Sequence, residues 1–132
     1  MPYILKVATN KLPILNIYGN DYDTIDGTGV RDYIHVLDLA RGHVLALKNP
    51  KVGLKIYNLG TGHGTSVLEL VKKFEEVNNI KLNYQFANRR EGDIDTCYAS
   101  CLKAKEELGF ECIYTIDDMC KDAYNFAIKN TN

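Results

Sequence analysis

The sequence predicts a small α/β domain, and three observations lead to that class. Short apolar or β-branched runs alternate with longer segments whose apolar residues recur at helical spacing. The order is strand, strand–helix, strand–helix, strand and two final helices, which indicates α/β without fixing a topology. The 132 residues, 45% of them apolar and 25% charged, suit one globular unit without repeats or linkers.

The first half of the chain contains two predicted strands, a loop and a helix. Residues 12–19 form a short apolar run that ends at a glycine, which is typical of a buried strand. Residues 20–29 hold three aspartates and two glycines, so we expect a loop that is long enough to be functional. Residues 30–36 predict a second strand, and Asp38 is a suitable N-cap for a helix that stops before Pro50.

The next part of the chain repeats the alternation. Residues 55–60 predict a strand, and Ser66 with Glu69 three residues later forms a capping box ahead of a helical apolar pattern. Residues 81–87 alternate between apolar and polar as a strand does. They lead into a charged loop at 88–95, which we expect to lie on the surface.

Two helices complete the prediction. Ser100 can cap a short helix over residues 102–108, which Gly109 ends as a C′ residue. Thr115 and Asp118 form an acidic variant of the capping box before the last helix.

Charge and hydropathy exclude several classes of partner. Sixteen Lys and Arg against seventeen Asp and Glu leave a formal charge of -1, which provides no positive field to attract nucleic acid. No apolar run approaches the roughly eighteen residues needed to cross a bilayer. The start of the chain lacks the basic head and long apolar core of a signal peptide. We therefore expect a cytoplasmic protein that binds neither nucleic acid nor membrane.

The cysteines favour a reducing compartment. All of them lie in the last third of the chain, as Cys97, Cys101, Cys112 and Cys120. Their spacing matches neither paired zinc knuckles nor a disulfide framework across the chain. The histidines stand far from them in sequence, so we expect reduced thiols and no structural metal.

Two features that suggest chemistry are weak on their own. Residues 60–65, GTGHGT, follow a predicted strand and precede a helix, as a dinucleotide fingerprint does, but Thr65 stands where the third glycine is required. Asn83 stands where an acidic ribose ligand would be sought. A tight turn is the favoured interpretation, with phosphate binding as the alternative. His35 lies in a strand pattern without a nucleophile motif, so we interpret it as structural.

Two loops carry arginines suited to phosphate. Arg31 follows the aspartate- and glycine-rich loop, and residues 89–90 are two arginines at the start of the second loop. Guanidinium groups offer planar pairs of donors to phosphate oxygens, and Asp93 could accept hydrogen bonds from sugar hydroxyls. Surface ion pairs with the neighbouring Asp32 and Glu91 are an equally good interpretation from these residues alone.

A resemblance to a known family adds to this reading. It is carried by three motifs, in order GNDYDTIDGTGVRDYIHVLDLARGHVLAL, KIYNLGTGHGTSVLELV and FANRREGDIDTCYAS. Together they resemble the C-terminal part of UDP-glucose 4-epimerases, members of the extended short-chain dehydrogenase/reductase superfamily. The resemblance implies a small mixed substrate-binding domain over residues 1–132 that lacks the N-terminal Rossmann half.

The same resemblance implies that catalysis needs more than this chain. The family holds NAD in the Rossmann half and uses a Tyr-x3-Lys pair there, but none of the nine tyrosines here is followed by lysine four positions on. It therefore implies a truncated gene product or a chain begun at an internal methionine, inactive alone, with no catalytic residue and no bound NAD. The expected partners are the UDP-sugar and the Rossmann half, with a homodimer only in the intact enzyme.

Eight substrate-binding positions follow from the resemblance: Asn16, Ile17, Tyr18, Arg31, Tyr33, Arg90, Asp93 and Cys97. The first three line the uracil site, largely through their backbone. The two arginines hold the diphosphate, with Tyr33 as a neighbouring aromatic residue of the same motif, and Asp93 binds the uridine ribose. Cys97 faces the hexose, where a tyrosine is typical of enzymes restricted to UDP-glucose and UDP-galactose. The smaller cysteine implies room for an N-acetyl group.

The implied activity of the intact enzyme is NAD-dependent isomerisation of UDP-glucose and UDP-galactose in galactose metabolism. A UDP-sugar-binding module without turnover is an alternative, and so is a fragment of a related nucleotide-sugar decarboxylase or dehydratase. The sequence leaves open which sugar is preferred and whether the chain folds or binds UDP by itself. We expect an exposed apolar face on the helix over residues 38–48, with low stability or self-association as the consequence.

Overall fold

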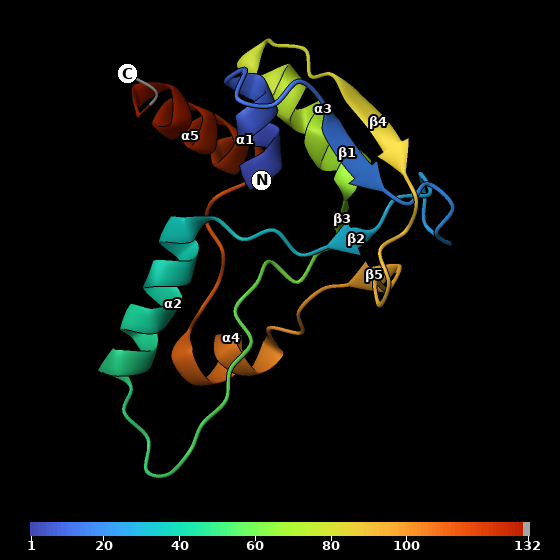
Figure 1. Ribbon diagram of the computed structural model, residues 1–132. Coiled ribbons are helices and arrows are strands. Elements are labelled where there is room, and N and C mark those ends of the chain that lie inside the picture. The colour runs from blue at the N-terminus through green and yellow to red at the C-terminus, as the bar shows by residue number, and fades with distance from the viewer. Residues whose placement is uncertain (131–132) are drawn as a thin grey trace.

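Five helices and five short strands make up residues 1–130, the part of the chain that the computed structural model describes (Figure 1). In chain order they are α1 (Pro2–Ala8), β1 (Leu15–Tyr18), β2 (Val30–Arg31), α2 (Val36–Lys48), β3 (Thr65–Ser66), α3 (Val67–Asn78), β4 (Tyr84–Ala87), β5 (Thr96–Cys97), α4 (Leu102–Leu108) and α5 (Ile116–Lys129). The predicted small mixed α/β class is confirmed.

The strands form two separate small sheets. In the first, β1 pairs with β4 in parallel, with Ile17 opposite Phe86. In the second, β2 is central, antiparallel to β3 and parallel to β5, and Arg31 lies opposite Cys97. The parallel pairing of β1 with β4 places the loops that flank β4 next to β1. The pairing of β2 with β5 likewise places the loops that flank β5 next to β2. Segments more than sixty residues apart in sequence therefore meet at the strand ends.

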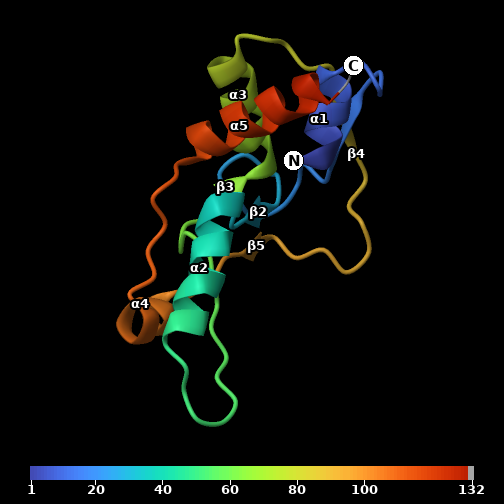
Figure 2. The same ribbon diagram turned by 90° about the vertical axis from the view of Figure 1, so that its left-hand side faces the viewer.

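The main hydrophobic core lies between β1 and the helices α1, α3 and α5. Figure 2 shows these three helices gathered at one end of the molecule, with α2 and α4 at the other. The core residues are fully or almost fully buried: Ile4, Val7, Leu15, Ile17, Leu70, Val71, Phe74, Leu82 and Cys120. This core fixes β1 and β4, and through them the loops that follow each strand.

Both predicted capping boxes are confirmed. At the start of α3, the Ser66 hydroxyl accepts a hydrogen bond from the Glu69 amide at 3.0 Å, and the Glu69 carboxylate accepts from the Ser66 amide at 3.3 Å. Thr115 and Asp118 form the same reciprocal pair at the start of α5. Each box satisfies two amides that the first turn leaves unpaired, which explains why both helices begin where the sequence predicts.

A smaller core holds α4 against α2. It is built from Ala104, Leu108 and Phe110, with Leu45 and Leu59 packed against them. The contact between α2 and the chain near Leu59 is close, because a Cβ placed on Gly42 would lie 2.5 Å from a Leu59 methyl carbon. Gly42 is therefore required by packing, although it stands inside a helix, where glycine costs stability.

The strand predictions were correct in place but too long, and one was wrong. The ranges 12–19 and 81–87 shrink to the four residues of β1 and β4, and 30–36 shrinks to the two residues of β2. Asp32 ends β2 because its carboxylate turns aside to bind the loop at residues 61–62. Residues 55–60 form no strand, since no other strand of the described residues lies beside them to receive their hydrogen bonds.

Two predicted helix caps were also wrong. His35, not Asp38, is the N-cap of α2, and its Nδ1 accepts a hydrogen bond from the Leu37 amide at 3.1 Å. The ring stacks on Tyr114 at 4.5 Å between centroids, which confirms the structural interpretation of His35. The N-cap of α4 is Cys101 rather than Ser100, without a side-chain cap, while Gly109 ends the helix in the left-handed region as predicted.

Asp38 has a different structural role inside the first turn of α2. Its fully buried carboxylate accepts hydrogen bonds from the amides of Ile113 and Tyr114 at 3.0 and 2.9 Å. Arg41 adds a third hydrogen bond at 2.6 Å. Asp38 thus ties α2 to the segment between α4 and α5, a role that sequence spacing cannot reveal. Helix α1, which begins at Pro2, was also not predicted from the sequence.

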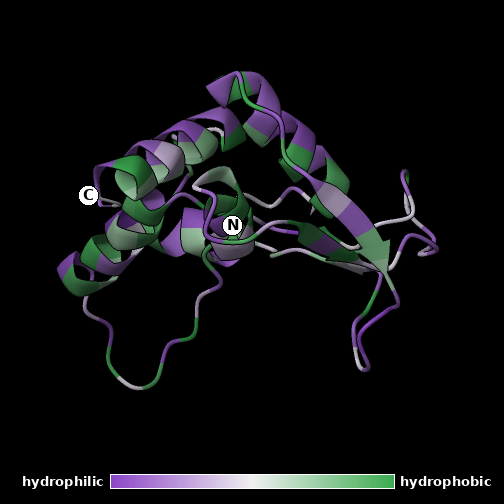
Figure 3. Ribbon diagram, turned by 45° about the horizontal axis from the view of Figure 1, so that its top comes forward, coloured by the Kyte–Doolittle hydropathy of each residue, from purple (hydrophilic) through white to green (hydrophobic). Residues whose placement is uncertain are grey.

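The predicted exposed apolar face of α2 is confirmed. Val44 and Leu47 are 48% and 81% exposed, and the apolar exposure continues into the following loop, where Val52 is 100% and Leu54 88% exposed. Figure 3 shows that this loop is coloured as hydrophobic over part of its length. No helix among residues 1–130 has the length and apolar character needed to cross a membrane.

Candidate functional site

Asp93 brings the two candidate phosphate-binding arginines together. Both Nε and Nη2 of Arg90 lie 2.9 Å from its Oδ2, and Nη2 of Arg31 lies 3.6 Å from its Oδ1. Arg31 ends β2 and Arg90 lies in the loop after β4, about sixty residues later in sequence, and the two share one carboxylate. The alternative prediction, in which these arginines pair with Asp32 and Glu91, is wrong, because both arginines pair with Asp93 instead.

Backbone contacts fix Arg31 in place. Its guanidinium donates to the carbonyl oxygens of Val30 at 2.7 Å and Ile94 at 2.8 Å. These bonds join the end of β2 to the loop before β5, so the register of the second sheet sets the direction of the side chain. Arg31 is therefore held before any ligand arrives, which lowers the entropy cost of binding an anion there.

Arg89 and Arg90 have different tasks although they are adjacent. Arg89 pairs with Asp21 at 2.7 Å and lies 4.1 Å over the ring of buried Tyr22, so it stabilises the loop at residues 20–29. Arg90 lies 5.0 Å over the exposed ring of Tyr18 and pairs with Asp93. Tyr18, Arg90, Asp93 and Arg31 thus form a continuous row, which we call the arginine cluster.

In strand β1 the backbone is available to a ligand, whereas the side chain of Ile17 is not. Ile17 is 1% exposed and belongs to the main core, so its side chain cannot touch a ligand. The exposed side chain of Asn16 accepts a hydrogen bond from Gln85 at 2.8 Å. Among the described residues β1 pairs with β4 alone, which leaves the groups on its second edge without a neighbouring strand.

The glycine-rich loop is an anion site that the chain itself fills. Oδ1 of Asp32 accepts hydrogen bonds from the Thr61 amide at 2.9 Å and its hydroxyl at 2.6 Å. Oδ2 accepts from the amides of Gly62 at 3.1 Å and Ala99 at 3.2 Å. Burial opposes the charge, but the hydrogen bonds from Thr61, Ala99 and Gly62 prevail and lower the pKa of Asp32.

This arrangement decides the outcome for residues 60–65. The donors that a cofactor phosphate would need are already bonded to Asp32, and a Cβ on Gly60 would lie 2.4 Å from its Oδ2. The described residues therefore do not fit a dinucleotide at this loop, and the phosphate-binding alternative loses its physical basis. The loop instead fixes the chain next to Arg31, a function that the sequence spacing did not suggest.

Tyr33 and Cys97 complete the predicted set but lie apart. Cys97 is exposed on β5 and lies opposite Arg31, a member of the arginine cluster, in the strand register. Tyr33 is half-buried and lines a separate cavity of about 660 Å³, and burial raises the pKa of its phenol. It is the only one of the eight predicted site residues on the wall of this cavity, as far as the described residues define it.

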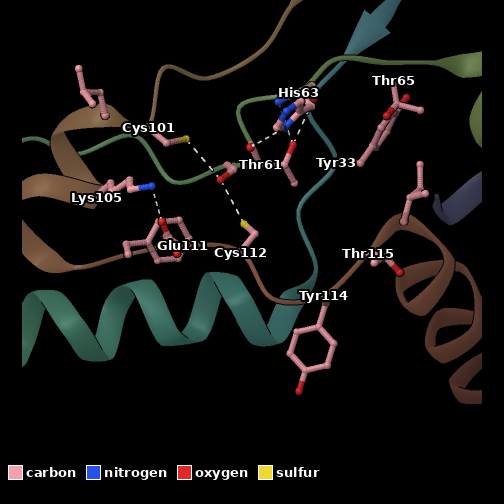
Figure 4. Close-up of a pocket in the computed structure, with 14 residues that line it drawn as sticks. Tyr33, Thr61, His63, Thr65, Cys101, Lys105, Glu111, Cys112, Tyr114 and Thr115 are labelled. Atoms are coloured by element: carbon pink, nitrogen blue, oxygen red, sulfur yellow. Dashed lines mark hydrogen bonds and ion pairs between the residues drawn. The ribbon is translucent and has the colours of Figure 1, made fainter.

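The cavity lies between the glycine-rich loop, α4 and the start of α5 (Figure 4). Its wall carries Thr61, His63, Cys101, Cys112 and the ion pair of Lys105 with Glu111. Within residues 1–130, no group of three or more histidine, cysteine or acidic side chains could hold a metal ion. All four cysteines are free thiols.

The comparisons agree on the kind of protein this chain resembles. A family model described as GDP-mannose 4,6 dehydratase matches residues 1–123. The UDP-glucose 4-epimerase of Bacillus subtilis (strain 168) is 54% identical over 134 residues, covering 100% of this chain and 40% of the relative. A UDP-glucose 4-epimerase of Cyamopsis tetragonoloba is 53% identical, over 98% of this chain and 38% of its own length.

Solved structures show the same relation. The UDP-glucose 4-epimerase from Bifidobacterium longum, in complex with NAD+ and UDP, superimposes with a TM-score of 0.95 at 51% identity, over 99% of this chain and 39% of that one. The UDP-Glc/GlcNAc 4-epimerase from Campylobacter jejuni reaches 0.86 at 32% identity, over 96% of this chain and 39% of that one. The chain spans about two fifths of its relatives' length and corresponds to their C-terminal portion.

Proposed function

The chain belongs to the GDP-mannose 4,6 dehydratase family, and from this premise we propose that residues 1–132 are the UDP-sugar-binding C-terminal domain of an NAD-dependent UDP-glucose 4-epimerase. The proposal rests on the arginine cluster, because two fixed guanidinium groups suit the oxygens of a diphosphate. A UDP-sugar-binding module without turnover is the second candidate. It is favoured by the same cluster, since that cluster binds and does not react.

The diphosphate takes the place that Oδ1 of Asp93 now occupies beside Arg31. The separation of 3.6 Å between Arg31 and Asp93 is longer than a hydrogen bond, so this ion pair is weak and easily exchanged. Phosphate oxygens accept charge-assisted hydrogen bonds from both guanidinium groups at once. Asp93 then keeps its contact with Arg90 and turns its free oxygen to the ribose hydroxyls, as the resemblance implies.

The uracil lies along β1. Because the side chain of Ile17 is in the core, recognition there uses the backbone of Asn16, Ile17 and Tyr18 on the edge without a neighbouring strand. The Tyr18 ring, next to Arg90, closes this side of the site. Backbone donors and acceptors suit a pyrimidine, whose edge carries both kinds of group.

The hexose lies toward Cys97. The thiol is small, exposed and opposite Arg31, so a bulky substituent at C2 of the sugar meets no large side chain at this position. We propose that the intact enzyme accepts UDP-N-acetylhexosamines as well as UDP-glucose and UDP-galactose. The likeness to an enzyme described as a UDP-Glc/GlcNAc 4-epimerase supports this extension.

The N-terminal half of the intact enzyme covers the exposed apolar surface of α2 and residues 51–60. Residues 55–60 carry a strand pattern but have no strand beside them here, and Ile56 is 69% exposed. Such a segment suits addition to the edge of a sheet, where its backbone groups find partners. That half would supply NAD and the catalytic base, and the homodimer forms only in the intact enzyme.

A titration with UDP tests the binding role directly. Two-dimensional amide spectra of the labelled chain should shift at residues of β1, β2 and the 88–95 loop when UDP is added. Replacing Arg31→Ala or Arg90→Ala should weaken binding by about tenfold or more, since each removes hydrogen bonds between charged groups of roughly 1.5–3 kcal/mol. Lys121→Ala, which removes an exposed positive charge on α5, is the matched control and should leave the affinity unchanged.

The outcomes separate the candidate functions. Dispersed spectra that do not respond to UDP, or that respond equally in all three variants, contradict the site. If UDP binds and fusion to a relative's N-terminal portion restores isomerisation of UDP-glucose in the presence of NAD, the epimerase proposal stands. If UDP binds but the fusion, folded and loaded with NAD, shows no turnover, the binding-module candidate replaces it.

A further inference from the structure

Two thiols share one backbone oxygen in the cavity beside the glycine-rich loop. The Sγ atoms of Cys101 and Cys112 lie 3.3 and 3.1 Å from the carbonyl oxygen of Gly60. Figure 4 draws both contacts as dashed lines that converge on that oxygen. Since both sulfurs touch the same atom, they are separated by less than the sum of the two distances. Neither thiol takes part in the UDP site proposed above.

The fold between the two cysteines makes this meeting a fixed feature. Cys101 is the N-cap of α4, and from there to Gly109 a helix rises about 12 Å. Gly109 ends the helix at a φ of 66°, and residues 110–112, which belong to no helix or strand, lead back to Cys112. Phe110, 1% exposed, anchors the returning segment against Ala104 and Leu108. Packing of the chain between the two cysteines therefore holds them next to each other.

A small reagent can reach both thiols. Cys101 and Cys112 line the open cavity, and both are half-buried. The other two cysteines differ in this respect, because Cys120 is fully buried in the main core and Cys97 stands alone and exposed on β5. Only one pair of thiols in the described part of the chain thus combines proximity with a common open wall.

We propose that Cys101 and Cys112 are a redox-active dithiol, which a low-molecular-weight disulfide oxidises to an intramolecular disulfide. The thiol of one cysteine first loses its proton to water. The resulting thiolate attacks the small disulfide, forms a mixed disulfide and releases one small thiolate. The second cysteine, also deprotonated, attacks the protein sulfur of that mixed disulfide and releases the second small thiolate. The two released thiolates take up the two protons, so one small disulfide becomes two small thiols and the protein loses two hydrogens.

Oxidation changes the neighbourhood of the glycine-rich loop. A disulfide requires the sulfurs to approach to about 2 Å, which removes both S–H donors from the Gly60 carbonyl. The next residue, Thr61, holds Asp32 beside Arg31. The redox state of the pair is therefore adjacent to the segment that positions the arginine cluster, and the Thr61 amide should report it.

The charges around the pair set its pH dependence. Burial, then the carboxylates of Asp38 and Asp32 and the Cys101 thiol, raise the pKa of Cys112 to about 11, while Arg41 acts in the opposite direction. Burial is also the first cause that raises the pKa of Cys101. Because the thiolate is the reactive form, the oxidation rate should increase about tenfold for each pH unit while the pH stays below the pKa of the attacking thiol.

Glutathione disulfide is the probe for the experiment. The reduced full chain is incubated with it at pH 7, 8 and 9, and free thiols, intact mass and cross-linked peptides are followed over time. We expect the thiols of Cys101 and Cys112 to disappear together, the mass of the peptides that contain them to fall by two hydrogens and one cross-link to join them, with no lasting mixed disulfide on either of these two cysteines. The rate should rise about tenfold from pH 8 to pH 9.

Single replacements provide the controls. In Cys101→Ser or Cys112→Ser the remaining thiol should accumulate as a mixed disulfide with glutathione, and serine retains a donor for the Gly60 carbonyl. Cys97→Ser should leave the cross-link unchanged. A lasting mixed disulfide on the wild-type pair, a cross-link through Cys97 or Cys120, or four unreacted thiols at pH 9 overturns the proposal. Amide spectra of each variant show whether it is folded.

Discussion

Asp32→Asn is the replacement that most directly tests how the glycine-rich loop holds the arginine cluster. The carboxylate of Asp32 accepts four hydrogen bonds, two at each oxygen. Asparagine preserves the size of the side chain and keeps one oxygen for Thr61. Its amide group must then face the amides of Gly62 and Ala99, where a donor meets donors. Two charge-assisted hydrogen bonds are therefore lost and no cavity is created.

The magnitude follows from those two bonds. A hydrogen bond to a charged group contributes roughly 1.5–3 kcal/mol. Asp32 is only half-buried, so the lower end applies to each bond, and the free energy of unfolding should fall by about 3 kcal/mol. A domain of this kind has a total of about 5–15 kcal/mol. With a urea dependence of about 2 kcal/mol per molar, the unfolding midpoint should move down by about 1.5 M.

The effect should depend on pH in a definite direction. Hydrogen bonds outweigh burial and lower the pKa of Asp32 in the folded chain below its unfolded value of about 3.9. A lowered folded pKa means that the stabilisation is complete above the unfolded value and is lost as the pH falls through the folded value. The difference between wild type and Asp32→Asn should therefore be constant from pH 8 to pH 5 and shrink below about pH 4.

Urea unfolding followed by circular dichroism at several pH values measures the effect. Asp23→Asn, at an exposed aspartate of the 20–29 loop, is the matched control and should change the free energy of unfolding by less than about 0.5 kcal/mol. The folded variant should also bind UDP more weakly, because Arg31 loses its fixed neighbour. A loss below 1 kcal/mol, or one that is equally large at pH 3 and pH 7, would refute the assigned role of Asp32.

Two further predictions concern the surface of α2 and the hexose site. Leu47→Lys should leave the free energy of unfolding within about 0.5 kcal/mol and reduce self-association in sedimentation, because Leu47 is 81% exposed. Ile25→Lys, at a position 96% exposed in the 20–29 loop, should not reduce self-association. Equal effects of the two replacements would contradict the proposal that the chain self-associates through α2. Cys97→Tyr should weaken UDP-N-acetylglucosamine binding about tenfold relative to UDP-glucose, whereas Cys97→Ser should not. An unchanged ratio in Cys97→Tyr removes the steric argument.

Local signals were sufficient for the helices whose ends are determined locally. The capping boxes of Ser66 and Thr115 act within four residues, so α3 and α5 begin where the sequence predicts. Gly109 ends α4 for the same reason, since its φ of 66° is a local property. The cap of α2 was missed because Asp38 has a side chain that N-caps prefer, whereas the helix is capped by His35, three residues earlier. The choice between them depends on the Ile113 and Tyr114 amides, which sequence cannot place.

The candidate site shows the same division. The sequence pointed to Arg31 and Arg90 as a pair and to Asp93 as a ligand of sugar hydroxyls, but not to the contact that Asp93 makes with both arginines. That contact depends on the parallel pairing of β2 with β5 and on the turn of the 88–95 loop. Asp32 was considered only as a partner for Arg31. Its real ligands lie about thirty and sixty-seven residues away, beyond any local pattern.

The failed strand at residues 55–60 and the exposed face of α2 have one physical explanation. A strand pattern records which side chains suit a sheet, but a strand exists only where a neighbour accepts its backbone hydrogen bonds. An apolar helix face likewise records a surface meant to be covered. In the main core the patterns predicted for β1 and α3 find their counterparts within the chain. Between Val36 and Gly60 the patterns are equally clear, but Val44, Leu47 and Ile56 stay exposed, as expected if this segment is shaped for the partner half proposed above.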